Sequence, residues 1–311
     1  MRRRLRVRRL ESYDCLVEVR PGAPGRPPLF LLCWTGGKLI AYHDLVERLP
    51  ADQPVYGLRA PTFDGRTHRF ASLEELAALF SEEIQRFWPE PPYFLAGYCF
   101  GGTLAHEVAS QMAAADLPTA FLGMIESSPY GHGEPRRPRP SQLTREIAWF
   151  RAFVKEPFGR KARLLSVRLF GRWSWWRKRL RRGAYSLVLR TGWVWPGRLW
   201  NLNLLEIRSA LLKYRVPRTD MRITLFEAHD PNDGPLEPTV WTRLVDQVEL
   251  HVISAPGIGH VSIMWRPYVE QLSEQFNERL SAAVVAAPLG LAVPRDRDDL
   301  VEPVSTRRVD L

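Results

Sequence analysis

One six-residue segment, Gly97-Tyr98-Cys99-Phe100-Gly101-Gly102, constrains the fold of this chain more than any other part of its sequence. It follows an apolar run over residues 92–96 and precedes a stretch of helical character over residues 103–112. Small residues on both sides of Cys99 allow a strand to turn sharply into a helix and push the central side chain into the open. The segment therefore predicts a nucleophile elbow that carries a thiol.

The predicted position of Cys99, at the N-terminus of a helix, suits a reactive thiol. The helix dipole and the unpaired backbone N–H groups favour a thiolate there, and the Phe100 N–H is placed to donate to an oxyanion. A free cysteine in a glycine-rich turn is also commonly a small buried apolar residue. The choice between these interpretations depends on whether the sequence supplies a base and an acid.

The sequence around the elbow alternates short apolar segments with amphipathic ones, which is typical of a mostly parallel sheet covered by helices on both faces. Strands are predicted at residues 29–34, 54–60, 92–96, 120–126, 221–227 and 248–254. Helices are predicted at residues 38–49, 73–87, 103–112 and 267–282. Ser72 and Glu75 form a capping box at the start of the second of these helices.

Residues 135–219 interrupt this alternation and differ in composition. They hold 22 Arg and Lys against three acidic residues, and seven of the 11 Trp, in a chain whose formal net charge is +10. Such an insertion between two sheet strands is typical of a helical lid over an active site. The predicted organisation is one domain over residues 12–285 with 135–219 as a basic, Trp-rich lid, a basic N-terminal segment 1–11 and a flexible C-terminal tail 286–311.

Composition also excludes several classes of protein. No apolar stretch approaches the roughly 18 residues that a membrane span needs, and no apolar stretch of the kind found in secretory signals follows the Arg-rich start. Three cysteines, an odd number, argue against a disulfide framework and favour a cytoplasmic location. No Cys/His cluster has metal-ligand spacing and no phosphate-loop or dinucleotide pattern occurs, so neither a metal nor a nucleotide cofactor is expected.

A cysteine nucleophile needs a histidine as base and an acid that orients it. His260 lies in a glycine-containing turn after the strand at 248–254 and before the last helix, where the strand order of α/β-hydrolases places the base. His251 falls inside a predicted strand and His106 on the helix after the elbow. We interpret both as packing residues.

Two residues are candidates for the acid, and two backbone N–H groups for the oxyanion hole. Glu126 ends the strand that follows the elbow helix, whereas Asp230 follows the strand at 221–227, the more common acid position in hydrolases of this order. Acids at strand ends also commonly cap helices or face water, so position alone leaves both open. Thr35 N–H, in the loop after the first strand, is predicted to act beside Phe100 N–H, while Cys33 is interpreted as core.

Several segments resemble the thioesterase domains that end non-ribosomal peptide synthetases and polyketide synthases. The resemblance follows in order through residues 28–31 leading into Gly36-Gly37, residues 53–58, Pro92-Tyr93 before the elbow, residues 214–226 and Gly259-His260. It implies an α/β-hydrolase fold and a Cys-His-acid triad. In that family the acid stands in a Leu-Leu-Asp type sequence that aligns with Met124-Ile125-Glu126, so the resemblance favours Glu126 over Asp230.

Three departures from the family pattern bear on the chemistry. Cys99 stands where most members carry Ser, Glu126 where Asp is usual, and Cys33-Trp34-Thr35 where His-Pro-Ala is frequent. A thioester acyl-enzyme is more reactive to amines than an oxygen ester, so the cysteine suits transfer to nitrogen as well as hydrolysis.

The resemblance implies that the substrate is held on the phosphopantetheine of an acyl or peptidyl carrier protein, and that the chain needs no cofactor of its own. Because carrier proteins are commonly acidic, the basic lid is predicted to dock one. Peripheral membrane contact through Trp and Arg is the weaker alternative, and no nucleic-acid-binding motif accompanies the charge. No carrier domain is visible, and the initial Met with the Arg-rich start favours a free-standing protein.

Two other functions stay open. A dienelactone-hydrolase-like enzyme shares the cysteine elbow and has its acid near the position of Asp230. A non-catalytic binding module on the same fold would keep Cys99 as a relic. The large predicted lid and the family-like segments favour a thioesterase over the former, and the joint presence of nucleophile, base position and glycine-rich loop favours catalysis over the latter.

Overall fold

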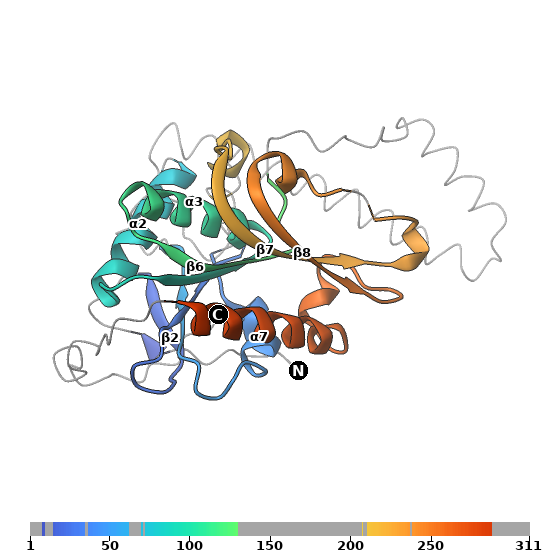
Figure 1. The fold of residues 1–311 in the computed structure, drawn as a ribbon, viewed down its shortest axis with the longest axis horizontal. Helices are drawn as coiled ribbons and strands as arrows, with labels where there is room; N and C mark the ends of the chain where they lie inside the picture. The colour runs from blue at the N-terminus through green and yellow to red at the C-terminus, as the bar shows by residue number, and fades with distance from the viewer. Residues whose placement is uncertain are drawn as a thin grey trace, which may run out of the picture. The chain divides into compact units, whose positions relative to one another are not determined.

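The structure is a computed structural model that describes residues 8–9, 15–34, 37–61, 70, 72–129, 207, 210–236 and 238–287. Within these residues, eight strands form one sheet in the order β1-β2-β4-β3-β5-β6-β7-β8 (Figure 1). The strands are β1 Arg8–Arg9, β2 Leu16–Arg20, β3 Leu29–Leu32, β4 Val55–Leu58, β5 Tyr93–Tyr98, β6 Thr119–Ile125, β7 Thr219–His229 and β8 Val245–Ser254.

The sheet is mostly parallel, as predicted. All neighbouring pairs from β4 to β8 run parallel, whereas β2 pairs antiparallel with β4 and β1 antiparallel with β2. The central strands β3 and β5 are buried along their whole length, which is why each appears in the sequence as a continuous apolar run. The short antiparallel strands β1 and β2 were not among the predicted elements.

Helices cover both faces of the sheet, which is the arrangement of an α/β-hydrolase fold. Figure 1 shows α2 Leu73–Phe87 and α3 Phe100–Ala114 on one face and α7 Tyr268–Ala286 on the other, where the short α1 His43–Val46 also packs. Residues 207 and 210–213 are also α-helical. The described 3-10 turns are η1 Ile40–Tyr42, η2 Pro231–Asp233, η3 Val240–Arg243 and η4 Ser262–Met264. The N-cap half of the predicted capping box is confirmed at α2, where Ser72 Oγ accepts from Glu75 N–H at 3.2 Å.

The helix predicted at residues 38–49 is wrong in length. The segment forms only η1 and the four-residue α1, although its apolar residues do face the core. After Val46 the backbone tightens, because Arg48 N–H and Leu49 N–H bond to carbonyls three residues earlier. Pro50 follows and disfavours helical geometry at the residue before it.

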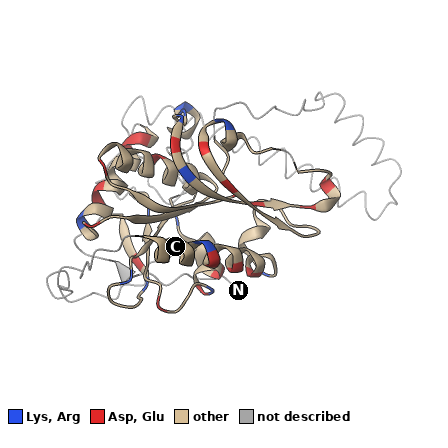
Figure 2. Ribbon diagram, viewed as in Figure 1, with Lys and Arg blue, Asp and Glu red and all other residues tan. Residues whose placement is uncertain are grey.

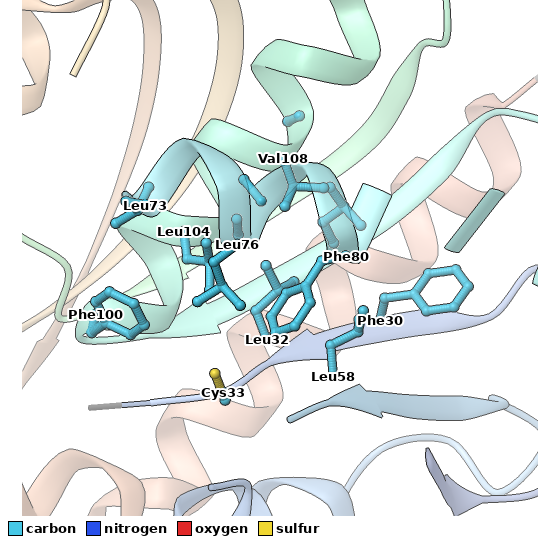
Figure 3. Close-up of a cluster of buried hydrophobic side chains, with 14 of the residues drawn as sticks. Phe30, Leu32, Cys33, Leu58, Leu73, Leu76, Phe80, Phe100, Leu104 and Val108 are labelled. Carbon is cyan, nitrogen blue, oxygen red and sulfur yellow. The ribbon is translucent and has the colours of Figure 1, made fainter. Parts of the chain in front are cut away.

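Two apolar layers fill the space between sheet and helices. Side chains of β3 alternate between them, with Phe30 and Leu32 facing α2 and α3 while Leu29 and Leu31 face α1 and α7. Figure 3 shows part of the first layer, where the sulfur of Cys33 lies among apolar side chains. Cys33 has no exposed surface and packs in this layer, so its interpretation as a core residue is confirmed. Burial raises the pKa of its thiol to about 12.

The predicted insertion 135–219 lies almost entirely outside the described residues, as do most of segments 1–11 and 286–311. Five buried residues near its C-terminal end pack in the same layer as α2 and α3: Ile207, Ala210, Leu211, Tyr214 and Val216. Thr219, its last residue, already begins β7. Among the described helices, none combines the length and apolar character that crossing a membrane requires.

Candidate active site

Cys99 occupies the sharp turn between β5 and α3 that the glycine spacing predicts. Its backbone has φ 57° and ψ −119°, a conformation that few residues with a side chain adopt, and it is the N-cap residue of α3. Two hydrogen bonds hold this conformation: Cys99 N–H donates to the Ile125 carbonyl at 2.8 Å, and Ser127 Oγ donates to the Cys99 carbonyl at 2.9 Å. The thiol is thereby presented with 8% of the residue exposed.

Glycine is required on both sides of this turn because the backbone folds tightly on itself. A Cβ at Gly97 would lie 2.0 Å from the Gly101 carbonyl oxygen, and one at Gly102 would lie 1.8 Å from Ser127 Oγ. Neither distance is compatible with a carbon atom at its normal contact radius. The glycines of the motif are therefore steric requirements of the elbow.

Glu126 and His260 come together at the carboxyl edge of the sheet, from the segments that follow β6 and β8 on either side of β7. Glu126 follows β6 directly, and its Oε2 lies 3.0 Å from His260 Nδ1. Its other oxygen accepts from the Ala228 N–H on β7, and its own N–H donates to the Phe226 carbonyl at 2.8 Å. With φ 48°, the Glu126 backbone bends its carboxylate toward the turn that carries His260.

The Cys99 side chain hydrogen-bonds to the same histidine. This bond first, and the bond to Glu126 second, raise the pKa of His260 to about 10. Because Nδ1 faces Glu126, Nε2 is the nitrogen left for Cys99. Both partners favour the charged form of the imidazole, which lies between the Cys99 sulfur and the Glu126 carboxylate.

This shift predicts how His260 contributes to stability as the pH changes. A pKa raised from 6.5 to about 10 means that the folded chain binds the proton more tightly than the unfolded chain. The contribution of this proton to stability is fully present below about pH 6.5 and is lost as the pH rises through about 10.

His260→Gln should therefore lower the Tm at pH 6 and lower it less at pH 10. Because 47% of the side chain is exposed, we expect a few degrees at most. Thermal unfolding of both proteins across this range tests the sign, and a difference that grows with pH would contradict it.

Asp230, the other candidate acid, contacts the turn before His260 rather than its ring. Its Oδ1 accepts from Asn232 N–H at 2.9 Å and its Oδ2 accepts from Gly257 N–H at 2.8 Å. These backbone hydrogen bonds, with that of Asn232 the larger, lower the pKa of Asp230. The carboxylate thus ties the end of β7 to the turn that carries His260.

One of the two predicted oxyanion donors lies in the described residues. Phe100 is the first residue of α3, so its N–H has no acceptor within the helix. Thr35 lies outside the described residues, and its role as the second donor stays a prediction. Tyr42, which no pattern in the sequence marks as a site residue, also supports the elbow. Its hydroxyl donates to the Leu32 carbonyl at 2.6 Å and accepts from Tyr98 N–H at 2.7 Å.

The histidines interpreted as packing residues do pack. His106 is fully buried, its ring centroid lies 5.1 Å from that of Trp241, and burial lowers its pKa to about 4. His251 stacks on Phe226 at 5.2 Å. These two predictions are confirmed.

In the part of the chain that is described, one cluster has metal-ligand geometry: His43, Asp44 and Glu47, whose donor atoms lie within 4.8 Å of one another. Exposed acidic groups are common at protein surfaces without an ion, and this cluster supplies no reason to assign a metal.

Comparison with known proteins places these residues in context. Residues 27–165 match a family model described as "Thioesterase domain". Malpibaldin synthetase of Mortierella alpina is 39% identical over 118 residues, which are 38% of this chain and 2% of that protein. The non-reducing polyketide synthase PFUR17_0229 of Pseudevernia furfuracea is 37% identical over 118 residues, 38% of this chain and 6% of that protein. The chain thus spans a small fraction of these relatives.

A solved structure extends the likeness to the whole fold. The NocB thioesterase domain from the nocardicin cluster aligns with a TM-score of 0.55 at 20% identity, covering 86% of this chain and 99% of that domain. At this identity the likeness concerns the fold alone, and it agrees with the α/β-hydrolase architecture described above.

Proposed function

We propose that this chain, which carries a thioesterase domain of the kind found in non-ribosomal peptide and polyketide synthetases, releases a polyketide or peptide acyl chain through a thioester on Cys99. The observation that carries the proposal is the hydrogen-bonded series from Cys99 through His260 to Glu126. These groups supply a nucleophile, a base and an orienting acid in contact with one another.

In the first step the Cys99 thiolate attacks the carbonyl carbon of the substrate thioester. A C–S bond forms, and the carbonyl oxygen takes the negative charge close to the Phe100 N–H. When the tetrahedral intermediate collapses, the substrate C–S bond breaks. The departing phosphopantetheine thiolate takes its proton from the His260 imidazolium, which becomes neutral.

In the second step an acceptor attacks the acyl group on Cys99. Neutral His260 removes a proton from water, the oxygen bonds to the carbonyl carbon, and the bond from that carbon to sulfur breaks. The products are a carboxylic acid and the restored Cys99 thiolate with a protonated His260. Glu126 holds Nδ1–H throughout and keeps Nε2 directed at the reacting atoms. An amine or alcohol in place of water gives an amide or ester by the same sequence.

The proposal of a carrier protein as partner rests on the positive charge of residues 135–219. Both signs are interspersed over the described residues (Figure 2), whereas residues 135–219 hold 22 Arg and Lys against three acids. An acidic carrier protein would be steered to that segment, and its docking would weaken as salt is added. A cytoplasmic location stays a prediction from the cysteine content.

The two candidate acids should differ sharply in their kinetic effects. Glu126→Gln removes the charge that faces Nδ1 and should lower kcat by about 10²- to 10⁴-fold, the range seen when a triad acid is neutralised. Asp230→Asn keeps an oxygen that can accept from Gly257 N–H and should lower kcat less than about tenfold. Steady-state hydrolysis of an acyl-N-acetylcysteamine thioester measures both, with Tm as the folding control. The reverse ranking would favour the dienelactone-hydrolase-like alternative, whose acid stands near Asp230.

The substrate class is tested by comparing leaving groups and carriers. We expect turnover of acyl groups on a phosphopantetheinylated carrier protein to exceed that of the same acyl-N-acetylcysteamine thioester in kcat/KM, and the advantage to shrink with added salt. A dienelactone serves as the competing substrate. Preferential turnover of the lactone would overturn the proposal, and no turnover of any thioester would favour a non-catalytic module.

A further inference from the structure

We propose that Tyr98 is a positioning residue that holds His260 against Cys99 and whose ring stabilises the charged form of that histidine. This inference rests on the proposed function, because it concerns the base of the same reaction. Tyr98 is the last residue of β5 and immediately precedes the nucleophile.

Tyr98 contacts His260 in two separate ways. The two rings stack with centroids 5.3 Å apart and planes inclined by 26°. The Tyr98 hydroxyl also donates to the backbone carbonyl of His260 at 2.7 Å. The Tyr98 side chain therefore sets both the distance and the orientation of the imidazole relative to β5, the strand that leads into Cys99.

Tyr98 is itself held firmly enough to act as a reference. The residue is 2% exposed, its N–H donates to the Tyr42 hydroxyl, and it pairs with Ile125 on β6. Trp34, which precedes the predicted oxyanion loop, stacks on it with centroids 6.3 Å apart. These contacts fix Tyr98 relative to the sheet. Through Tyr98, the sheet also fixes the position of the His260 ring.

The ring also acts on the charge of His260. A cation within about 6 Å of an aromatic centroid is attracted to the face of the ring, and a neutral imidazole gains much less. Within the part of the chain that the structure describes, the titratable groups that contact His260 are Cys99 from the elbow, Glu126 after β6 and Tyr98 itself. Further out, Asp230 bonds to the same turn, and Glu227 lies close enough to Glu126 to interact with its charge. The Tyr98 ring thus stabilises the imidazolium in addition to the hydrogen bonds from Cys99 and Glu126. A stabilised imidazolium in turn stabilises the Cys99 thiolate beside it.

The experiment measures the rate of alkylation of Cys99 by iodoacetamide as a function of pH, read from the mass of the Cys99 peptide. The other two cysteines, Cys15 and Cys33, have no exposed surface, whereas 8% of Cys99 is exposed. Four variants are compared with the wild type: Tyr98→Leu, Tyr98→Phe, His260→Gln and Tyr268→Phe. The last is the matched control, because the Tyr268 hydroxyl donates to the carbonyl of Pro256 on the same turn at 2.9 Å.

Removal of the ring should raise the pH midpoint of alkylation, because the thiolate loses part of its charged partner. We expect Tyr98→Leu to raise it by about half a pH unit and His260→Gln to raise it further. Tyr98→Phe should keep the wild-type midpoint and lower thioester turnover by about three- to tenfold, since only the bond to the His260 carbonyl is lost. Tyr268→Phe should keep the wild-type midpoint and turnover.

Two outcomes separate this inference from the proposed function. If Tyr98→Leu titrates like the wild type while His260→Gln is shifted, the ring only fills space, and the inference is overturned with the function intact. If His260→Gln also titrates like the wild type, the Cys99–His260 pair is not formed and both are overturned. Should Tyr98→Leu unfold, Phe and pentafluorophenylalanine at position 98 are compared instead. They have nearly the same shape, and only the fluorinated ring should raise the midpoint.

Discussion

Replacement of Cys99 by Ala is expected to lower kcat for thioester turnover by about 10⁴- to 10⁶-fold, the scale on which triad nucleophiles act. The reason is that, among the described residues, Cys99 is the nucleophile whose side chain hydrogen-bonds to His260. Steady-state kinetics with an acyl-N-acetylcysteamine thioester gives the value. Cys15→Ala is the matched control, because Cys15 is a buried core thiol. It should keep its turnover and lose about 1 kcal/mol of stability.

Cys99→Ser tests whether the reaction depends on the thiolate in particular, and not only on a nucleophile at this position. A serine hydroxyl has no accessible anion at neutral pH and needs a neutral His260 to remove its proton. The variant should be well below the wild type and above Cys99→Ala, because the binding surface and Phe100 N–H are unchanged. If Cys99→Ala retained more than about 1% of wild-type kcat, another group would carry the reaction.

The second large effect concerns folding. Gly97→Ala is expected to destabilise the protein by about 3 kcal/mol or more. The new Cβ would meet the Gly101 carbonyl oxygen at 2.0 Å, the Gly101 carbonyl carbon at 2.1 Å and the Gly102 nitrogen at 2.4 Å. All three are backbone atoms at the start of α3 and cannot move without opening the elbow.

The chain offers a matched control for this substitution. A Cβ at Gly259 meets no atom within 4 Å, so Gly259→Ala should change the free energy of unfolding by less than about 0.5 kcal/mol. Urea unfolding of both variants measures the difference. Equal stabilities would show that the turn around Cys99 is more open than the contacts of Gly97 indicate.

The elbow was predictable because its signal is local. Small residues at fixed spacing between an apolar run and a helical one admit few backbone paths, and β5, Cys99 and α3 follow that path. The central parallel strands were predictable for a similar reason, since burial on both faces gives continuous apolar runs. The helix at residues 38–49 failed because apolar spacing does not reveal where a helix tightens and ends.

Some active-site contacts could not be predicted from the sequence, because they depend on where a side chain points and not on where its residue stands along the chain. Both Glu126 and Asp230 stand at ends of strands, so their positions leave the acid open and only the family resemblance favours Glu126. In the structure Glu126 meets the imidazole, while Asp230 bonds to Gly257 N–H. Tyr98 lies 162 residues from His260, and nothing in the spacing of the motif indicates that its hydroxyl reaches that carbonyl. Such contacts follow from how the sheet brings its carboxyl ends together.

The central claim is that the acyl chain passes through Cys99, and intact mass measured after rapid mixing tests it most directly. The wild-type protein and Cys99→Ala are each mixed with acyl-carrier or acyl-N-acetylcysteamine thioesters, quenched within the first turnover and weighed. We predict one acyl adduct on the wild type that maps to Cys99, decays as acid, amide or ester appears, and is absent from Cys99→Ala. Equal adducts on both proteins, or full turnover by Cys99→Ala without any adduct, would contradict it.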